Sequence, residues 1–223
     1  MTTLLMATRN AHKVGEIQTI LGANFHCLTL KNFPAAPAVV EDADTFAGNA
    51  TKKAVALAQW LALQVPIPNS LLPSPHFVLA DDSGLEVDFL NGAPGVHSAR
   101  FAALDKTGNA PDADNNGKLL RLLENVPLAK RTARFRCVLA LVAIHPAAAP
   151  LAPHLFDGAC EGRIQLTASG AKGFGYDPLF VPDGYAQSFA ELGEEVKNQW
   201  SHRARALAKL KAAFENQLAT RTR

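Results

Sequence analysis

The sequence predicts a protein of the α/β or α+β class with a mixed β-sheet. Strand-like and helix-like patterns alternate over the first third of the chain, whereas the middle is rich in strand-like segments. Helices between strands are typical of α/β folds, and runs of consecutive strands are typical of α+β folds. The two patterns in one chain therefore favour a sheet of mixed strand direction with helices beside it.

The first elements follow from short local patterns. The apolar run at residues 3–7 predicts a buried strand, and the next segment has apolar residues at helical spacing closed by Gly22. A second strand is expected at 25–30. The run 45–63, rich in Ala, Lys, Gln and Leu, predicts a helix with Asp44 or Thr45 as its N-cap. The apolar run 77–80 predicts a short strand that ends at two carboxylates.

The second half of the chain contains the longer strands. Residues 115–123 predict a short helix, and 132–144 predict a long strand that alternates at first and then becomes continuously apolar. The segment 155–167 is its expected antiparallel partner. A final helix is expected at 201–218, where Ala204, Leu207 and later apolar residues recur at helical spacing.

Composition predicts a cytoplasmic globular protein of one or two domains. The chain has 223 residues, of which 48% are hydrophobic, too many for a disordered protein. A net charge of +2 is too small for a protein that coats DNA. Three cysteines without a CxxC pair argue against a disulfide framework or a zinc site. No apolar run reaches the ~18 residues of a membrane span, and the start of the chain has no signal-peptide pattern.

A polar segment between the first strand and the first helix is a candidate phosphate site. Its residues are Thr8, Arg9, Asn10, Ala11, His12 and Lys13. Free backbone N–H groups and the positive end of a helix dipole attract anions at such a junction. Thr8, Asn10 and Lys13 would add donors suited to a polyphosphate. The alternative is that Asn10 only caps the helix and Lys13 is solvated, since no Walker A pattern is present.

Two adjacent acids, Asp81 and Asp82, are the second candidate. Buried charge without a partner is costly, so acids after an apolar strand indicate either a general base or a divalent-metal site. Strand alternation sends the two side chains to opposite faces, so one is expected to face a shared pocket. Glu41 and Asp42 could add oxygen ligands for Mg²⁺. The alternative is a turn in which these acids cap backbone amides.

Two further segments could contact a flat ligand. Residues 173–178 place glycines on both sides of an aromatic residue, which suits a loop that approaches a ring closely. The alternative is an aromatic turn that anchors the core. In residues 197–203, Ser201 is a good N-cap, which puts His202 and Arg203 in a first helical turn, against the helix dipole. An anion or a base edge nearby would offset that cost; the alternative is a solvated basic face.

These segments, in this order, resemble the inosine/xanthosine triphosphate pyrophosphatase family. The matching stretches are ATRNAHK, EDADTFAGNATKKA, ADDSGLEVDFLNGAPGVHSARF, and GFGYDPLF through FAELGEEVKNQWSHRARAL. The resemblance implies an elongated mixed α/β fold, one domain over residues 1–223 with two lobes around a central nucleotide cleft, and a homodimer. It also implies Mg²⁺-dependent hydrolysis of noncanonical purine nucleoside triphosphates (ITP, dITP, XTP) to the monophosphate and pyrophosphate, which cleanses the nucleotide pool.

The resemblance further implies individual roles. Phosphate contacts are expected from Thr8, Asn10 and Lys13, within the segment that includes Arg9, Ala11 and His12, and from Lys53. Glu41 and Asp82 match acids that hold metal and activate water, with Asp82 as general base. Ser83 matches a substrate contact. The positions that match the base-binding loop and the group reading the C6 oxygen are Phe174, Gly175, Tyr176, Asp177, Lys197, His202 and Arg203.

The expected base preference has a physical reason. A 6-keto purine offers an acceptor where adenine offers a donor, so a site lined by donors would leave the amino group of adenine unsatisfied. Guanine shares the 6-keto group, and its rejection would depend on its 2-amino group.

The sequence departs from the family pattern at three places. Gly48 stands where the family usually has Glu, His97 where Tyr is commoner, and the proline-rich segment 64–76 is longer than expected. Gly48 leaves open a catalytically weakened nucleotide-binding or regulatory protein. A pyrophosphatase for modified pyrimidine nucleotides is a second alternative. Nucleic-acid binding by the basic C-terminal helix is least favoured, because its charges alternate with a core-facing stripe, and neither a nucleic-acid nor a membrane partner is expected.

Overall fold

The computed structural model describes residues 2–63, 76–103, 108–144 and 152–221. The chain forms two compact units. The first comprises Met1–Asp82, Val138–Asp157 and Ala206–Arg223, and the second comprises Ser83–Cys137 and Gly158–Arg205. The proline-rich segment noted above lies, apart from its last residue, outside the described residues.

Six strands form one sheet in the order β2-β1-β3-β4-β5-β6. Strand β1 (Thr2–Met6) pairs in parallel with β2 (Phe25–Thr29) and with β3 (His76–Val87). Strand β4 (Thr132–Ala143) lies between β3 and β5 (His154–Ile164). The short strand β6 (Phe180–Pro182) pairs antiparallel with β5. Parallel and antiparallel pairs occur together, which confirms the mixed sheet.

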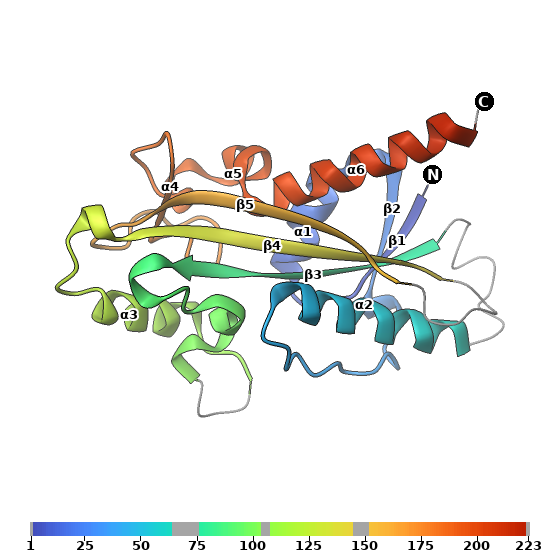
Figure 1. Cartoon of the computed structure of the whole chain (residues 1–223), viewed down its shortest axis with the longest axis horizontal. Helices are drawn as coiled ribbons and strands as arrows, with labels where there is room; N and C mark the ends of the chain where they lie inside the picture. The colour runs from blue at the N-terminus through green and yellow to red at the C-terminus, as the bar shows by residue number, and fades with distance from the viewer. Residues whose placement is uncertain (1, 64–75, 104–107, 145–151, 222–223) are drawn as a thin grey trace. The chain divides into compact units, whose positions relative to one another are not determined.

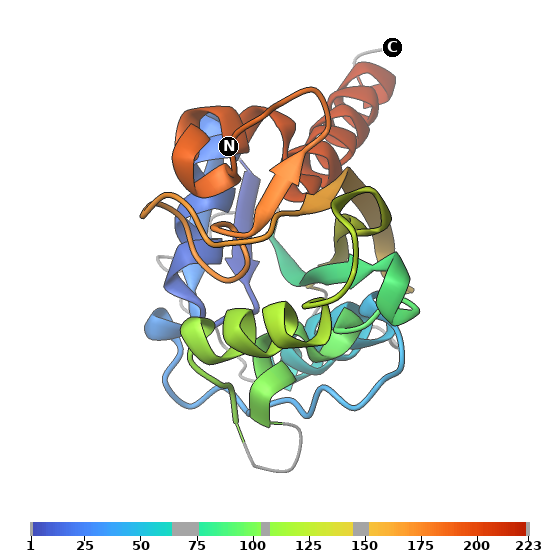
Figure 2. The same ribbon diagram turned by 90° about the vertical axis from the view of Figure 1, so that its left-hand side faces the viewer.

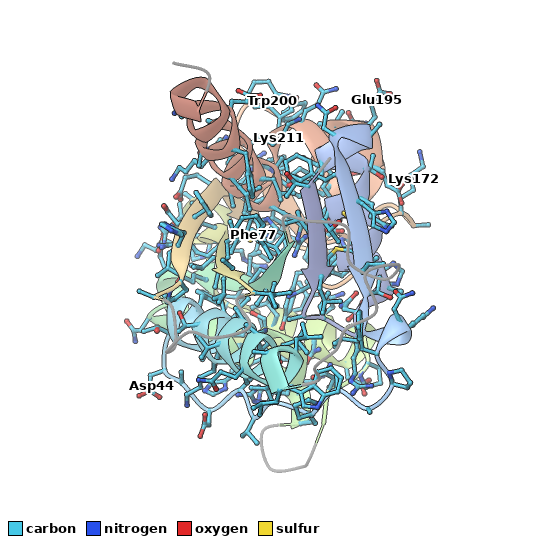
Figure 3. The ribbon with its side chains drawn as sticks, turned by 90° about the vertical axis from the view of Figure 1, so that its right-hand side faces the viewer. Asp44, Phe77, Lys172, Glu195, Trp200 and Lys211 are labelled. Atoms are coloured by element: carbon cyan, nitrogen blue, oxygen red, sulfur yellow. The ribbon has the colours of Figure 1, made fainter. Side chains whose placement is uncertain are left out.

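Helices cover both faces of the sheet in the first unit. Helices α1 (Ala11–Leu21) and α6 (His202–Arg221) lie on one face and α2 (Phe46–Leu63) on the other (Figure 1). Phe214 of α6 packs edge-on against Phe77 of β3, with ring centroids 5.3 Å apart. Figure 3 shows Phe77 beneath α6. Apolar burial between these layers is the main favourable contribution to the stability of the unit.

Local capping signals fix where these helices begin and end. The Asn10 side chain accepts hydrogen bonds from the backbone N–H groups of His12 and Lys13, at 3.0 and 3.1 Å, and so caps α1. Gly22 ends α1 with a φ of +71°, a conformation that favours glycine. The Ser201 hydroxyl accepts from the N–H of Ala204 and caps α6, as expected.

The second unit has its own apolar core, in which Phe135, Phe180 and Phe189 are neighbours. Helix α3 (Asp112–Leu122) lies on one side of its strands, and α4 (Phe189–Leu192) and α5 (Glu194–Trp200) lie on the other (Figure 2). Short 3-10 turns connect these elements and those of the first unit: Gly22–Asn24, Leu30–Asn32, Asp88–Leu90, Gly95–Ala103 and Leu128–Lys130. In the described part of the chain, no helix is both long and apolar enough to cross a bilayer.

Strand β3 corrects the sequence prediction most clearly. A strand at 77–80 that ends at the two carboxylates was expected, but β3 continues through both acids to Val87. The extension is supported by a distant side chain, because Ser98 accepts a hydrogen bond from the N–H of Leu85 at 2.9 Å. Gly84 permits this approach, since a Cβ there would overlap the Ser98 hydroxyl and the Gly95 carbonyl. The turn interpretation of the two acids is therefore wrong.

Candidate active site

A cluster of two lysines and three carboxylates surrounds β3 in the first unit. Lys13 of α1 donates to Asp81 Oδ1 at 2.7 Å. Lys53 of α2 donates to Glu41 Oε2 at 2.7 Å, to Asp82 Oδ1 at 3.1 Å and to the Asp81 carbonyl at 2.9 Å. Asp81 and Asp82 thus turn to helices on opposite faces of the sheet, as strand alternation predicts.

The electrostatics of the cluster single out Asp82, which is 7% exposed. Burial raises the pKa of Asp82 to about 6, despite the opposing effect of the Lys53 and Lys13 ammonium groups. Burial also acts to raise the pKa of Glu41, but Lys53, Asp82 and Lys13 together outweigh it and the net direction is down. The carboxylates of Asp82 and Glu41 outweigh burial at Lys53 and raise its pKa. Lys53 and Glu41 therefore stay charged at neutral pH, while Asp82 titrates close to it.

One oxygen of Asp82 is available for chemistry. Asp82 Oδ2 is buried and has no hydrogen-bond partner among the described residues. A buried acceptor without a donor costs on the order of 1–3 kcal/mol, and such atoms in native proteins call for a functional explanation. An oxygen of this kind can accept a proton or bind a cation.

The donor set fits a magnesium ion that is shared with a ligand. Glu41 and Asp82 supply two hard carboxylate oxygens. Within the described residues, no group of three or more His, Cys, Asp or Glu could form a metal site made of protein side chains alone. Mg²⁺ binds proteins through one or two carboxylates and completes its shell with waters and substrate phosphates. Asp42, the other expected ligand, is 62% exposed at its side chain and pairs with Lys52 instead.

In the segment before α1, the structure confirms one part of the alternative interpretation and contradicts the other. Asn10 caps the helix, and Thr8 accepts a hydrogen bond from the N–H of Asn10 at 3.2 Å. Arg9, Ala11 and His12 are exposed. Lys13 is not a solvated residue of the first turn, because its ammonium pairs with buried Asp81. The contacts of Lys13 thus connect this segment to the carboxylate cluster.

Sequence reasoning missed Asn49, a buried residue of the helix that carries Lys53. Its buried side chain accepts from the N–H of Ala43 at 2.9 Å and donates to the Ala43 carbonyl at 3.2 Å. This two-point contact fixes the segment that carries Glu41. A Cβ at Gly48 would overlap the Cβ of Ala43, so this segment fills the space beside position 48. A buried Asn within an apolar helix was the available signal.

In the second unit, the loop at 173–178 is built around a buried ion pair. Lys197 donates to Asp177 Oδ2 at 2.6 Å, and the same oxygen accepts from the N–H of Phe174 at 2.8 Å. Both members of the pair are buried, and the Lys197 ammonium lies 4.2 Å from the centre of the Phe174 ring. The Lys197 ammonium therefore contacts both the Phe174 ring and the Asp177 carboxylate.

The other predicted residues of this unit are also ordered by specific contacts. Arg203 is buried and donates to the Ser83 hydroxyl at 2.9 Å, while His202 stacks on Phe135. The solvated-face interpretation is therefore wrong for His202 and Arg203. Tyr176 lies in the apolar core, where its hydroxyl donates to the Ser98 carbonyl at 2.9 Å and burial raises its pKa. Tyr176 thus anchors the loop, as the alternative interpretation of this segment expected.

The pKa of Asp82 predicts how stability depends on pH. The pKa in the folded state, about 6, lies above the ordinary 3.8, so the native state favours the protonated acid. That contribution is complete below about pH 4 and is lost as the pH rises through about 6. Asp82→Asn, which cannot ionise, should gain several degrees in melting temperature relative to wild type between pH 5 and pH 8, measured by calorimetry.

Asp44→Asn is the matched control, since Asp44 is exposed on the same unit and points to solvent (Figure 3). Its melting temperature should follow that of wild type at both pH values. A difference between Asp82→Asn and wild type that does not change with pH would show that Asp82 titrates as an ordinary carboxyl group.

Fold and site together define a class: mixed-sheet α/β proteins that combine a buried lysine–carboxylate cluster with a loop built on a buried Lys–Asp pair. The chain belongs to the Ham1 family, whose model matches residues 4–213. It is 44% identical over 216 residues to the dITP/XTP pyrophosphatase of Shouchella clausii, covering 96% of this chain and 98% of that relative. It is 46% identical over 207 residues to that of Desulforamulus reducens, covering 92% of each.

Solved structures of the family have the same fold. A HAM1 protein from Coxiella burnetii superposes with a TM-score of 0.77 at 34% identity, covering 97% of this chain and 100% of that one. The Staphylococcus aureus Ham1 protein gives a TM-score of 0.76 at 32% identity, covering 96% of this chain and 99% of that one. The family and the α/β fold predicted from the sequence are thereby confirmed.

Proposed function

We propose that this protein is a Mg²⁺-dependent pyrophosphatase that hydrolyses ITP, dITP and XTP to the monophosphate and pyrophosphate. The observation that carries the chemistry is the buried, unpartnered Oδ2 of Asp82, next to Lys53 and Glu41. The names of the curated relatives support the substrate class. The homodimer, the cytoplasmic location and the role in cleansing the nucleotide pool, which the family resemblance implies, belong to the same proposal.

The phosphate chain binds on the first unit. The ammonium groups of Lys13 and Lys53 attract phosphate oxygens, and the start of α1 adds the positive end of its dipole. Glu41 and Asp82 are the residues that would hold Mg²⁺. When bound, Mg²⁺ would supply positive charge that offsets the negative charge of the phosphate oxygens.

Asp82 acts as the general base. Its ionised carboxylate takes a proton from water as the water oxygen forms a bond to a phosphorus of the α–β linkage. The bridging P–O bond breaks, and its electron pair leaves with the product that does not contain the attacked phosphorus: pyrophosphate for attack at the α-phosphorus, the monophosphate for attack at the β-phosphorus. The proton held by Asp82 then passes to solvent. A pKa of about 6 suits this cycle, because the acid is ionised at neutral pH and is still basic enough to accept a proton.

The base binds on the second unit. Phe174 offers a half-buried ring for stacking. The family resemblance assigns Lys197, His202 and Arg203 as the donors to a C6 oxygen. The 6-amino group of adenine would meet these donors with another donor. The family resemblance implies that both sets of residues belong to a single two-lobed domain over 1–223. Asp82, the last residue of the first segment of one unit, and Ser83, the first residue of the other, are consecutive in the chain.

Product analysis tests the proposed reaction. The purified full-length protein is incubated with ITP and MgCl₂, and IMP, IDP, pyrophosphate and orthophosphate are quantified. One IMP and one pyrophosphate are expected per ITP, with activity lost in EDTA and restored by excess Mg²⁺. IDP with orthophosphate would contradict the proposal. Tight ITP binding by calorimetry without turnover would favour the weakened binding protein that Gly48 leaves open.

A further inference from the structure

Helix α3 holds the loop that carries Phe174. Asp112 Oδ2 accepts a hydrogen bond from the N–H of Gly175 at 2.6 Å, and Asn116 Nδ2 donates to the Gly175 carbonyl at 3.0 Å. Asp112 and Asn116 are four residues apart and therefore neighbours on one face of the helix. Figure 2 shows α3 beside the loop that follows β5. One helix thus fixes both backbone polar groups of a single glycine.

The rest of the loop is fixed around this glycine. Gly175 has a φ of +64°, a left-handed conformation that glycine adopts readily. On one side, the N–H of Phe174 is bound by Asp177, and on the other the hydroxyl of Tyr176 is bound to the Ser98 carbonyl. The backbone on both sides of the Phe174 ring is therefore preorganised, and α3 supplies the hydrogen bonds at its centre.

The contact of Asn116 contributes little to stability overall. Its Oδ1 is buried and has no hydrogen-bond partner in the part of the chain that the structure describes. A buried acceptor without a donor offsets most of what one amide hydrogen bond contributes. An apolar residue of similar shape would serve a purely structural position at least as well. The specific effect of the Asn116 amide is to fix the position of Gly175.

We propose that Asp112 and Asn116 are positioning residues for base discrimination, an inference that rests on the proposed function. They act through Gly175 on the Phe174 ring and on the Asp177–Lys197 pair beside it. Loosening the loop would weaken recognition of the purine. It would leave the phosphate contacts of Lys13 and Lys53 unchanged, because those residues belong to the other unit.

The test separates binding of the base from binding of the phosphate chain. Asp112→Ala and Asn116→Leu each remove one contact, and Asp112→Asn keeps an acceptor oxygen for the Gly175 N–H. Asp114→Ala is the matched control, since Asp114 is an exposed acid in the same first turn of α3. For each protein, kcat and KM are measured with ITP and ATP, together with inhibition by IMP and by inorganic tripolyphosphate.

Asp112→Ala and Asn116→Leu should raise KM for ITP and weaken IMP inhibition about tenfold, the effect of one lost hydrogen bond. The preference for ITP over ATP should fall with them. Tripolyphosphate inhibition should not change, and Asp112→Asn and Asp114→Ala should stay within about twofold of wild type. Unchanged IMP inhibition in both variants, or an equal loss of IMP and tripolyphosphate inhibition, would overturn the positioning role. Wild-type protein that fails to turn over ITP would instead contradict the proposed function itself.

Discussion

Asp82→Asn is expected to lower kcat for ITP by about a thousandfold or more while the protein remains folded. The amide cannot accept a proton from the attacking water, and general-base catalysis alone contributes on the order of 10²–10⁴-fold. The amide is also a weaker ligand for Mg²⁺ than a carboxylate. The fold should survive, because the substitution replaces a buried ionisable group with a neutral one of the same shape. Single-turnover kinetics with ITP measure the chemical step directly.

Asp42→Asn provides the control for a loss of negative charge near the site. Asp42 lies next to Glu41 in sequence, but it is exposed and pairs with Lys52. Its activity should remain within about twofold of wild type, since exposed ion pairs contribute little. If Asp82→Asn kept wild-type activity, Asp82 could not be the base.

Lys53→Met is expected to have the largest effect on stability. The Lys53 ammonium bonds Glu41, Asp82 and the Asp81 carbonyl, so its removal leaves buried acceptors without their donor. Removing one partner of a buried ion pair costs about 3–5 kcal/mol of unfolding free energy. Because Glu41 is partly exposed, we expect a loss at the lower end of this range, about 3 kcal/mol. Urea unfolding followed by circular dichroism measures this change.

The same variant should change the pH dependence of the rate. Lys53 lowers the pKa of Asp82, so without it that pKa rises above about 6. The rate depends on ionised Asp82, and its rise with pH should therefore move to higher pH in Lys53→Met. Lys52→Met, on the exposed side of the same helix, should change neither the free energy of unfolding nor the pH dependence of the rate. A pH profile that does not move would separate Lys53 from the ionisation of Asp82.

Much of the fold could be predicted because its signals are local. The cap at Asn10, the stop at Gly22 and the apolar runs of β1 and β4 each depend on a few neighbouring residues. The predicted end of β3 at residue 80 was wrong because the signals that extend this strand are not local. Two acids and a glycine resemble a turn, and the groups that keep them in a strand come from distant segments, such as Ser98.

The sequence predicted which residues belong to the candidate site better than it predicted which of them contact each other. The acids at 81 and 82 stand out after an apolar strand, but the sequence pattern did not give their lysine partners. Asn49, Asp112 and Asn116 were missed because each binds the backbone of another segment. A backbone group can accept such a contact whatever its side chain, so no residue pattern marks the pairing.

The ratio of kcat/KM values among nucleotides tests the central claim most directly. The full-length protein is assayed with ITP, XTP, GTP, ATP and a panel of modified pyrimidine triphosphates in Mg²⁺, and pyrophosphate release is followed. A donor-lined base site predicts that ITP and XTP exceed ATP by about a hundredfold or more, with pyrimidines hydrolysed slowly. Equal rates on the four purine nucleotides, or a preference for the pyrimidines, would contradict the assignment.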